Sequence, residues 1–311
     1  MRVLDLFCGA GGLSLGFRDE GFSITGADNN PYSGKIFSIN HIGEFIDIDL
    51  TEKPVTDSFD IIVGGPPCRP WSTVNLQRRG SLHPEYILLD RFFEHIIALK
   101  PRAFLLENVL PLGHDARFLE LIGKATHEGY HILFRTVRYS DFGATTRRQR
   151  LIAVGFREFG LNASEFFERL EQMKEPFLTV GQTIKQYENF MYGEYPDHEW
   201  PNLTTIDKYQ KYYKSGKYGW FKLDYDDCSP SFGNIMKTYI LHPLAGMNGY
   251  PLRVISVREA LEIMGFPSTF TFPSGMGMSM KYQMVANSVS PVVARKLARV
   301  IKCMLQSRSF L

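Results

Sequence analysis

The chain has 311 residues, 44% of them hydrophobic, which is enough for a sizeable core in one large domain or two smaller ones. Its 35 basic and 33 acidic residues give a net charge of only +2, which excludes a strongly basic chain, so any nucleic-acid-binding surface must be local. The four cysteines form no C-x-x-C pair, which argues against a zinc site and against a disulfide framework.

Short apolar runs alternate with helical patterns from residue 1 to about residue 178. Strands are predicted at residues 3–7, 23–27, 60–63, 103–106, 133–137 and 151–155, and helices at residues 13–20 and 86–99. Strands that alternate with helices predict an α/β fold with a mostly parallel sheet. In such sheets, ligands bind beyond the carboxyl ends of the strands.

The character of the sequence changes between residues 179 and 252, which are rich in Tyr, Lys, Asp, Gly and Pro and have little clean periodicity. A smaller second domain or a large insertion is predicted there. Helical patterns return at residues 257–264 and 291–305. No basic and apolar leader begins the sequence, and no uncharged apolar stretch is long enough to cross a bilayer. We therefore expect a cytoplasmic location and no membrane partner. The widely spaced cysteines predict reduced thiols and no metal.

A glycine-rich turn, Asp-Leu-Phe-Cys-Gly-Ala-Gly-Gly at residues 5–12, follows the first predicted strand. Glycines there allow the backbone to approach a ligand closely. A full dinucleotide motif would need glycine at position 14, where the chain has Ser14. Asp28 could accept hydrogen bonds from ribose hydroxyls, and Asp49 from an adenine amino group. These features indicate a nucleoside-type ligand, and a turn that merely packs helix on strand is the alternative.

Cys68 has prolines on both sides, at positions 66, 67 and 70. Since proline cannot continue a central strand or a helix interior, Cys68 must lie on a stiff loop after the strand at 60–63. Arg69 beside it would favour the thiolate, which is the nucleophilic form. We interpret Cys68 as a nucleophile, with a structural thiol in a rigid loop as the alternative.

Glu107 directly follows the predicted strand at 103–106, so it should lie at the same sheet edge as Cys68. A buried carboxyl there could donate a proton to a ring nitrogen. The alternative for Glu107 is a helix-capping or loop acid.

Arg148 and Arg150 precede the strand at 151–155. In an extended segment their side chains point the same way, so they could hold a carbonyl oxygen and phosphates. The alternative for these arginines is a solvated basic run.

In this order, the segments resemble the motif set of the DNA (cytosine-5) methyltransferases, over residues 4–297, with the middle region least matched. The matching segments are residues 5–12, Pro-Pro-Cys at 66–68, Glu-Asn-Val at 107–109, Thr-Arg-Arg-Gln-Arg at 146–150, residues 253–267 and Ala-Asn-Ser-Val at 286–289. The resemblance implies a Rossmann-like fold that depends on S-adenosylmethionine. It also implies a catalytic domain at 1–178, a target-recognition domain at 179–252, and a hinge and C-terminal segment at 253–311 that returns to the catalytic domain.

The resemblance also assigns roles to residues, with S-adenosylmethionine as cofactor and S-adenosylhomocysteine as product. The implied cofactor-binding residues are Asp5, Phe7, Gly9, Ala10, Gly11, Gly12, Asp28, Asn29, Asp49, Leu50, Pro66, Leu88, Asn287, Ser288 and Val289. Asn29 stands where the family has a bulky residue against the adenine. In the implied reaction a cytosine is flipped out of the duplex, Cys68 adds to its C6 and Glu107 acts at N3. Arg150 holds O2, and Arg148 orients this cluster.

The implied substrate is double-stranded DNA with a short recognition sequence. Residues 208–220 interleave basic and aromatic side chains, which suits phosphates and base edges. We predict DNA contacts from Arg69, Ser72, Arg147, Lys208, Lys211, Lys214, Lys217 and Arg253. A solvated lysine face over a small aromatic core is the alternative. A monomer that acts on prokaryotic nucleoid DNA is expected, with a separately acting restriction endonuclease as its partner.

Three other functions compete with this one. A transfer-RNA branch shares these motifs, but it typically has a Cys-Phe-Thr segment that this chain lacks. A non-catalytic member would bind only nucleic acid or cofactor, and the presence of Cys68, Glu107 and Arg150 argues against it. Ser14 and the proline-framed cysteine disfavour a nicotinamide oxidoreductase.

Overall fold

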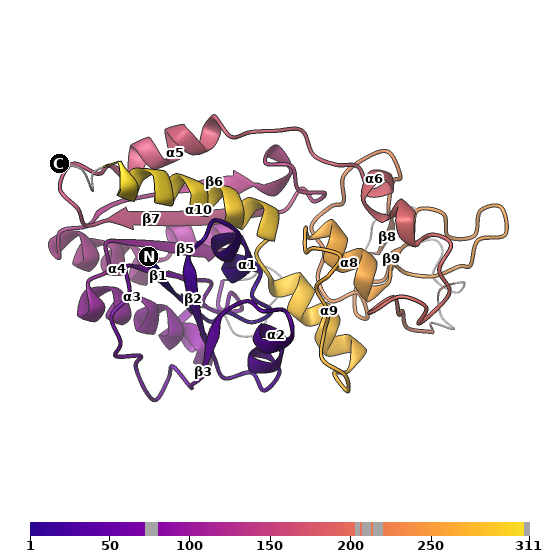
Figure 1. Ribbon diagram of the computed structural model, residues 1–311, viewed down its shortest axis with the longest axis horizontal. Coiled ribbons are helices and arrows are strands. Elements are labelled where there is room, and N and C mark those ends of the chain that lie inside the picture. The colour runs from indigo at the N-terminus through magenta and orange to yellow at the C-terminus, as the bar shows by residue number, and fades with distance from the viewer. Residues whose placement is uncertain (72–79, 203–205, 207–212, 214–219, 308–311) are drawn as a thin grey trace. The chain divides into compact units, whose positions relative to one another are not determined.

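The computed structural model describes residues 1–71, 80–202, 206, 213 and 220–307, which form two compact units (Figure 1). Unit 1 contains Met1–Arg138, Gln149–Lys174 and Val293–Leu311, and unit 2 contains Tyr139–Arg148 and Glu175–Val292. The chain passes between the units at residues 138–139, 148–149, 174–175 and 292–293. These boundaries differ from the three predicted segments, since residues 139–148 and 253–292 belong to unit 2.

Unit 1 contains a seven-stranded sheet in the order β3-β2-β1-β4-β5-β7-β6. Its strands are β1 (Arg2–Leu6), β2 (Ser23–Asp28), β3 (Glu44–Asp47), β4 (Ile61–Gly64), β5 (Ala103–Asn108), β6 (His131–Arg138) and β7 (Gln149–Phe156). β1 to β5 pair in parallel, whereas β7 runs antiparallel to both β5 and β6. The predicted α/β class with a mostly parallel, Rossmann-like sheet is confirmed. The strand order reverses between β1 and β4, which is where such sheets bind ligands.

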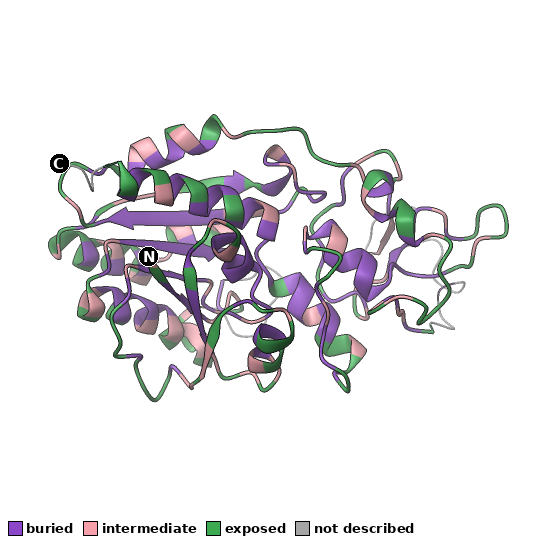
Figure 2. Ribbon diagram, in the orientation of Figure 1, coloured by how far each residue is buried: buried purple, intermediate pink, exposed green. Residues whose placement is uncertain are grey.

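Helices cover both faces of this sheet, because right-handed crossovers that leave the reversal point in opposite directions place their helices on opposite faces. The helices that contain unit 1 residues are α1 (Gly12–Asp19), α2 (Ser33–Ile39), α3 (Ile87–Leu99), α4 (Ala116–His127), α5 (Ala163–Glu171) and α10 (Pro291–Gln306). The described part of unit 1 also contains short 3-10 helices at Gly80–Leu82, Pro84–Tyr86 and Leu110–His114. β4 and β5 are buried along their whole length, as expected for strands covered on both faces. Figure 2 shows that β7 is also mostly buried.

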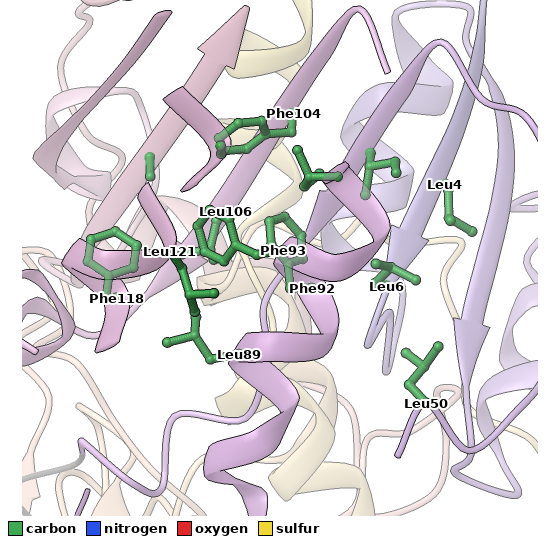
Figure 3. Packing of buried hydrophobic residues seen from close by; sticks show 14 of the residues in the cluster. Leu4, Leu6, Leu50, Leu89, Phe92, Phe93, Phe104, Leu106, Phe118 and Leu121 are labelled. Carbon is green, nitrogen blue, oxygen red and sulfur yellow. The ribbon is translucent and has the colours of Figure 1, made fainter. Parts of the chain in front are cut away.

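An apolar cluster joins α3 and α4 to one face of the sheet (Figure 3). Phe92 and Phe93 of α3 pack edge-on against Phe104 of β5, and Phe93 also packs edge-on against Phe118 of α4. Aromatic pairs of this geometry add to the free energy gained from burial alone. This cluster therefore fixes α3, α4 and the central strands to one another.

α1 packs closely on α10 because position 16 has no side chain. A Cβ at Gly16 would lie 2.4 Å from the backbone nitrogen of Arg295 and 2.5 Å from Cβ of Ala294. Such distances are far inside van der Waals contact, so only glycine permits this approach. The last helix of the chain is thereby held against the helix that follows the glycine-rich turn.

Unit 2 has less regular structure and is built around buried charges. Its described elements are α6 (Val180–Ile184), α8 (Val257–Ile263), α9 (Met278–Asn287), β8 (Phe221–Lys222), β9 (Ile240–Leu241) and 3-10 helices at Tyr139–Asp141 and Lys185–Tyr187. Glu259 of α8 is fully buried, and its carboxylate accepts hydrogen bonds from both terminal nitrogens of Arg253, at 2.7 and 2.8 Å. It also closes a capping box with Ser256. No helix in the described parts of either unit is both apolar enough and long enough to cross a membrane.

Candidate active site

The glycine-rich turn begins where β1 ends and has an unusual backbone. Phe7, Gly9 and Gly11 all have positive φ, at 62°, 53° and 76°. The glycines adopt this conformation freely, but for Phe7 it costs about 1 to 3 kcal/mol and indicates a constrained functional turn. The backbone N–H of Phe7 donates to the carbonyl of Ala27 at 2.9 Å, which ties the turn to β2.

Asp28 at the end of β2 holds the same turn in place. Its carboxylate accepts hydrogen bonds from the backbone N–H of Gly9 at 2.9 Å and from that of Asn30 at 2.8 Å. Burial raises the pKa of Asp28 from its ordinary value. A carboxylate that touches the glycine-rich turn is placed to accept further hydrogen bonds from a ligand in this turn.

Asp5 lies beneath the turn and is almost fully buried. Its carboxylate accepts a hydrogen bond from the hydroxyl of Ser14 at 2.6 Å. Burial raises the pKa of Asp5 to about 7, although the bond from Ser14 acts in the opposite direction. Ser14 therefore fills the place of a dinucleotide motif's third glycine with a buried hydrogen-bond donor.

Asp49, which follows β3, is oriented by its neighbours. One carboxylate oxygen accepts hydrogen bonds from the backbone N–H and hydroxyl of Thr51, at 2.8 and 2.6 Å, and the other accepts one from the Asn29 amide at 3.2 Å. The hydroxyl bond from Thr51 is the main reason that the pKa of Asp49 lies below its usual value. Asp49 is thus an ionised acceptor at the sheet edge, with Leu50 buried beside it and Leu88 half-buried on α3.

The loop after β4 carries Cys68 and is tied to the end of β5. The side-chain amide of Asn108 donates to the carbonyl of Pro66 at 2.9 Å. Gly65 lies against Glu107, since a Cβ at Gly65 would be 3.3 Å from a carboxylate oxygen of that residue. Cys68 itself is half-buried. The loop that carries the thiol and the carboxyl of Glu107 therefore lie at the same edge of the sheet.

Glu107 is 6% exposed and forms an ion pair with Arg150, with 3.1 Å between Nε and the carboxylate. Arg150 reaches this edge because β7 is antiparallel: Leu151 pairs with Asn108, so β7 starts where the parallel strands end. The pair places a carboxyl and a guanidinium together beside the cysteine loop, where they could bind the hydrogen-bonding edge of a pyrimidine.

That Arg148 orients this cluster stays a prediction. Arg148 precedes β7 and belongs to unit 2, where its buried guanidinium donates to the carbonyl of Ala286 at 2.7 Å. This contact supports the C-terminal end of α9, where the predicted cofactor residues Asn287, Ser288 and Val289 follow. Asn287 is exposed, whereas Ser288 and Val289 are buried in unit 2.

The residues predicted to contact DNA fall into three groups. Arg69 is exposed and pairs with Glu85 at 3.0 Å, and Arg147 is half-exposed and pairs with Asp227. Arg253 is buried, with its guanidinium against Trp200 and paired with Glu259, and its contact with DNA stays a prediction. Outside the described residues lie Ser72, Lys208, Lys211, Lys214 and Lys217.

Two residues of the site were missed by sequence reasoning. Asn108 links the loops after β4 and β5, and its position beside Glu107 was the available signal. Asp115 caps α4 and accepts a hydrogen bond from the indole of Trp71 at 2.9 Å. An aspartate before an apolar helical pattern signals a cap, but not a contact with the cysteine loop.

The fold and the site define a Rossmann-like methyltransferase. Residues 1–303 match the family model of the C-5 cytosine-specific DNA methylases. The type II methyltransferase M.NlaX of Neisseria lactamica is 30% identical over 334 residues, covering 99% of this chain and 98% of that protein. For M.MthTI of Methanothermobacter thermautotrophicus, another type II methyltransferase, identity is 28% over 337 residues, covering 97% of each.

A solved structure agrees in fold. A prophage-encoded E. coli protein described as a DNA modification methyltransferase matches with a TM-score of 0.75 at 22% identity, covering 98% of this chain and 99% of that one. The chain belongs to the C-5 cytosine-specific DNA methylases and is a DNA (cytosine-5) methyltransferase.

Proposed function

We propose that this enzyme methylates a cytosine that is flipped out of a short, specific sequence in duplex DNA, through a covalent bond from Cys68, as the modification partner of a restriction endonuclease. The observation that carries the proposal is the placement of the Cys68 loop beside the Glu107–Arg150 pair, at the carboxyl edge of the parallel strands. In this arrangement the loop that carries the proposed nucleophile lies beside a carboxyl and a guanidinium.

The proposed cofactor is S-adenosylmethionine, which supplies an electrophilic methyl group when bound. The described residues fit a nucleoside of this kind: a glycine turn with positive φ lies next to the carboxylate of Asp28, and the ionised Asp49 follows the neighbouring strand. Asp28 suits ribose hydroxyls, Asp49 suits an adenine amino group, and Phe7 offers an aromatic face. The turn at residues 9–12, Gly-Ala-Gly-Gly, would accommodate the methionine part.

The chemical problem is that C5 of cytosine is a poor nucleophile and is stacked inside the duplex. Flipping exposes the base, at a cost of a few kcal/mol for unstacking and unpairing. The Cys68 thiolate then forms a bond to C6, while Glu107 donates a proton or hydrogen bond to N3 and Arg150 holds O2. The addition makes C5 nucleophilic. After C5 has accepted the methyl group, loss of the C5 proton breaks the bond to Cys68 and restores the ring.

We assign the chemistry to unit 1 and DNA reading to residues 179–252 of unit 2. Unit 1 holds the described thiol, carboxyl and glycine turn, and the basic and aromatic segment at 208–220 supports the second assignment. Lysines suit the phosphate backbone, which supplies most of the affinity for DNA.

The test is replacement of the thiol. Cys68→Ser should abolish incorporation of radiolabelled methyl groups into duplex DNA and formation of an adduct with duplex DNA that contains 5-fluorocytosine. Calorimetric binding of S-adenosylmethionine should survive. Cys303→Ser is the matched control, because this cysteine is exposed on α10 and should tolerate the change. Methylation by Cys68→Ser at the wild-type level would remove Cys68 from the reaction. In a separate experiment, bisulfite sequencing of DNA from a host that produces the wild-type enzyme would identify the target sequence.

A further inference from the structure

Asp115 makes more contacts than a helix cap requires. Its carboxylate accepts hydrogen bonds from the backbone N–H groups of Arg117 and Phe118 at 2.9 and 3.1 Å, which cap α4. It also accepts one from the indole N–H of Trp71 and one from the hydroxyl of Tyr86, both at 2.9 Å. One carboxylate therefore joins the start of α4 to two aromatic residues from other parts of unit 1.

Trp71 connects this carboxylate to the cysteine. Its backbone N–H donates to the carbonyl of Cys68 at 3.0 Å, which closes the turn that carries the thiol. The indole is only 7% exposed and packs against the ring of Tyr86, with 5.5 Å between ring centres. The turn that begins at Cys68 therefore ends at Trp71, whose buried indole N–H is bound to Asp115.

Tyr86, the residue before α3, supports the same contact. Burial, together with its bond to Asp115, raises the pKa of Tyr86 to about 12, so the phenol remains a hydrogen-bond donor at neutral pH. The carboxylate accepts the indole N–H on one oxygen, and on the other it accepts the phenol and the two capping N–H groups. An acceptor with both oxygens is needed to hold the two aromatic residues at once.

We propose that Asp115 is a positioning residue for the thiol of Cys68 and acts through Trp71 and Tyr86. The inference rests on the nucleophilic role proposed for Cys68. Without the second oxygen, a buried indole N–H loses this acceptor, which favours displacement of Trp71 and of the turn that it closes. Misplacement of a reacting group by about 1 Å can cost roughly 100-fold in rate.

Asp115→Asn separates this role from helix capping. Asparagine caps helices as well as aspartate does, but its side chain has only one acceptor oxygen. Trp71→Phe removes the indole N–H and keeps an aromatic ring beside Tyr86. Asn162→Ala is the matched stability control, because Asn162 caps α5 through the N–H of Ser164 at 2.8 Å. It should lower Tm without altering the chemistry.

We expect Asp115→Asn and Trp71→Phe to lower kcat by roughly 10- to 100-fold and to slow adduct formation with 5-fluorocytosine duplex by a similar factor. KM for DNA and the Kd for S-adenosylmethionine should stay within about twofold of wild type, since both reaction partners still bind. Asn162→Ala should form the adduct at the wild-type rate.

Wild-type kinetics of adduct formation in Asp115→Asn would overturn the positioning role and leave the proposed function intact. Failure of the wild-type enzyme to form an adduct through Cys68 would instead overturn the proposed function, and the positioning role with it. The two failures are therefore distinguishable in a single experiment.

Discussion

At the residue scale, positions 14 and 16 show how two small residues do different work within one helix. Ser14 carries the hydroxyl that binds the buried carboxylate of Asp5, while Gly16 allows the close approach of α10. The sequence indicated that the turn was not a dinucleotide motif. It could not show what Ser14 and Gly16 contact, because their partners lie on β1 and on α10 at the other end of the sequence.

Asp5 should make stability depend on pH. The pKa of Asp5 is about 7 in the folded protein and 3.8 ordinarily, so between these values the folded state binds more protons than the unfolded chain. The free energy of unfolding contributed by this group is therefore highest below about pH 4 and falls as pH rises to about 7. Asp5→Asn removes the titration, so Tm of the variant should fall less, or rise more, than that of wild type between about pH 4.5 and pH 8.

Thermal unfolding of both proteins across this range checks the prediction. Asp57→Asn is the control, because Asp57 is exposed in a loop. Parallel Tm curves for wild type and Asp5→Asn would show that Asp5 titrates normally in the folded protein.

At the element scale, long apolar runs were predictable and short or half-exposed elements were not. All six predicted strands and all four predicted helices are present, with ends shifted by a few residues. β3 was missed because it is a short edge strand with no buried residue, and β8 and β9 have only two residues each. α4 was missed although Phe118, Leu121 and Ala125 give it one buried face. That pattern is present in the sequence and is typical of an amphipathic helix.

The packing of α1 on α10 gives a direct test. Gly16→Ala should destabilise the protein by about 1 to 3 kcal/mol, because the added Cβ would overlap the backbone of α10. Gly123→Ala is the matched control: Gly123 lies on an exposed face of α4, with nothing within 4 Å of an added Cβ. This variant should gain about 0.5 to 1 kcal/mol from helix propensity. Denaturant unfolding measures both, and equal effects would contradict the close packing.

At the scale of the whole molecule, the site was predictable only where sheet topology determines it. Cys68 follows β4 and Glu107 lies near the end of the parallel strand β5, so their position at one edge of the sheet could be predicted from the sequence pattern. The contact of Arg148 with the carbonyl of Ala286 could not be predicted in this way, since the two residues are 138 positions apart in the chain. Periodicity describes a segment and contains no information about which unit it joins.

The two units should respond differently to loss of a buried charge. Glu259→Gln leaves the buried guanidinium of Arg253 without its counter-ion, and breaking such a pair costs about 3 to 5 kcal/mol. Hydrogen exchange should therefore accelerate in unit 2 peptides around α8 more than in the central strands of unit 1. Glu165→Gln, which breaks an exposed pair with Arg169 on α5, should cost no more than about 1 kcal/mol. Uniform acceleration across both units would mean that they unfold together.

The position of α10 in the chain determines what happens when the protein is produced as two fragments. A break between residues 174 and 175 would give two polypeptides, neither of which contains a whole unit. The first would contain the sheet and α1 without α10. The second would contain α10, with the face that packs on Gly16 of α1 exposed. We expect the two halves to regain activity only when they are produced together, so this chain is suited to conditional methylation by fragment complementation.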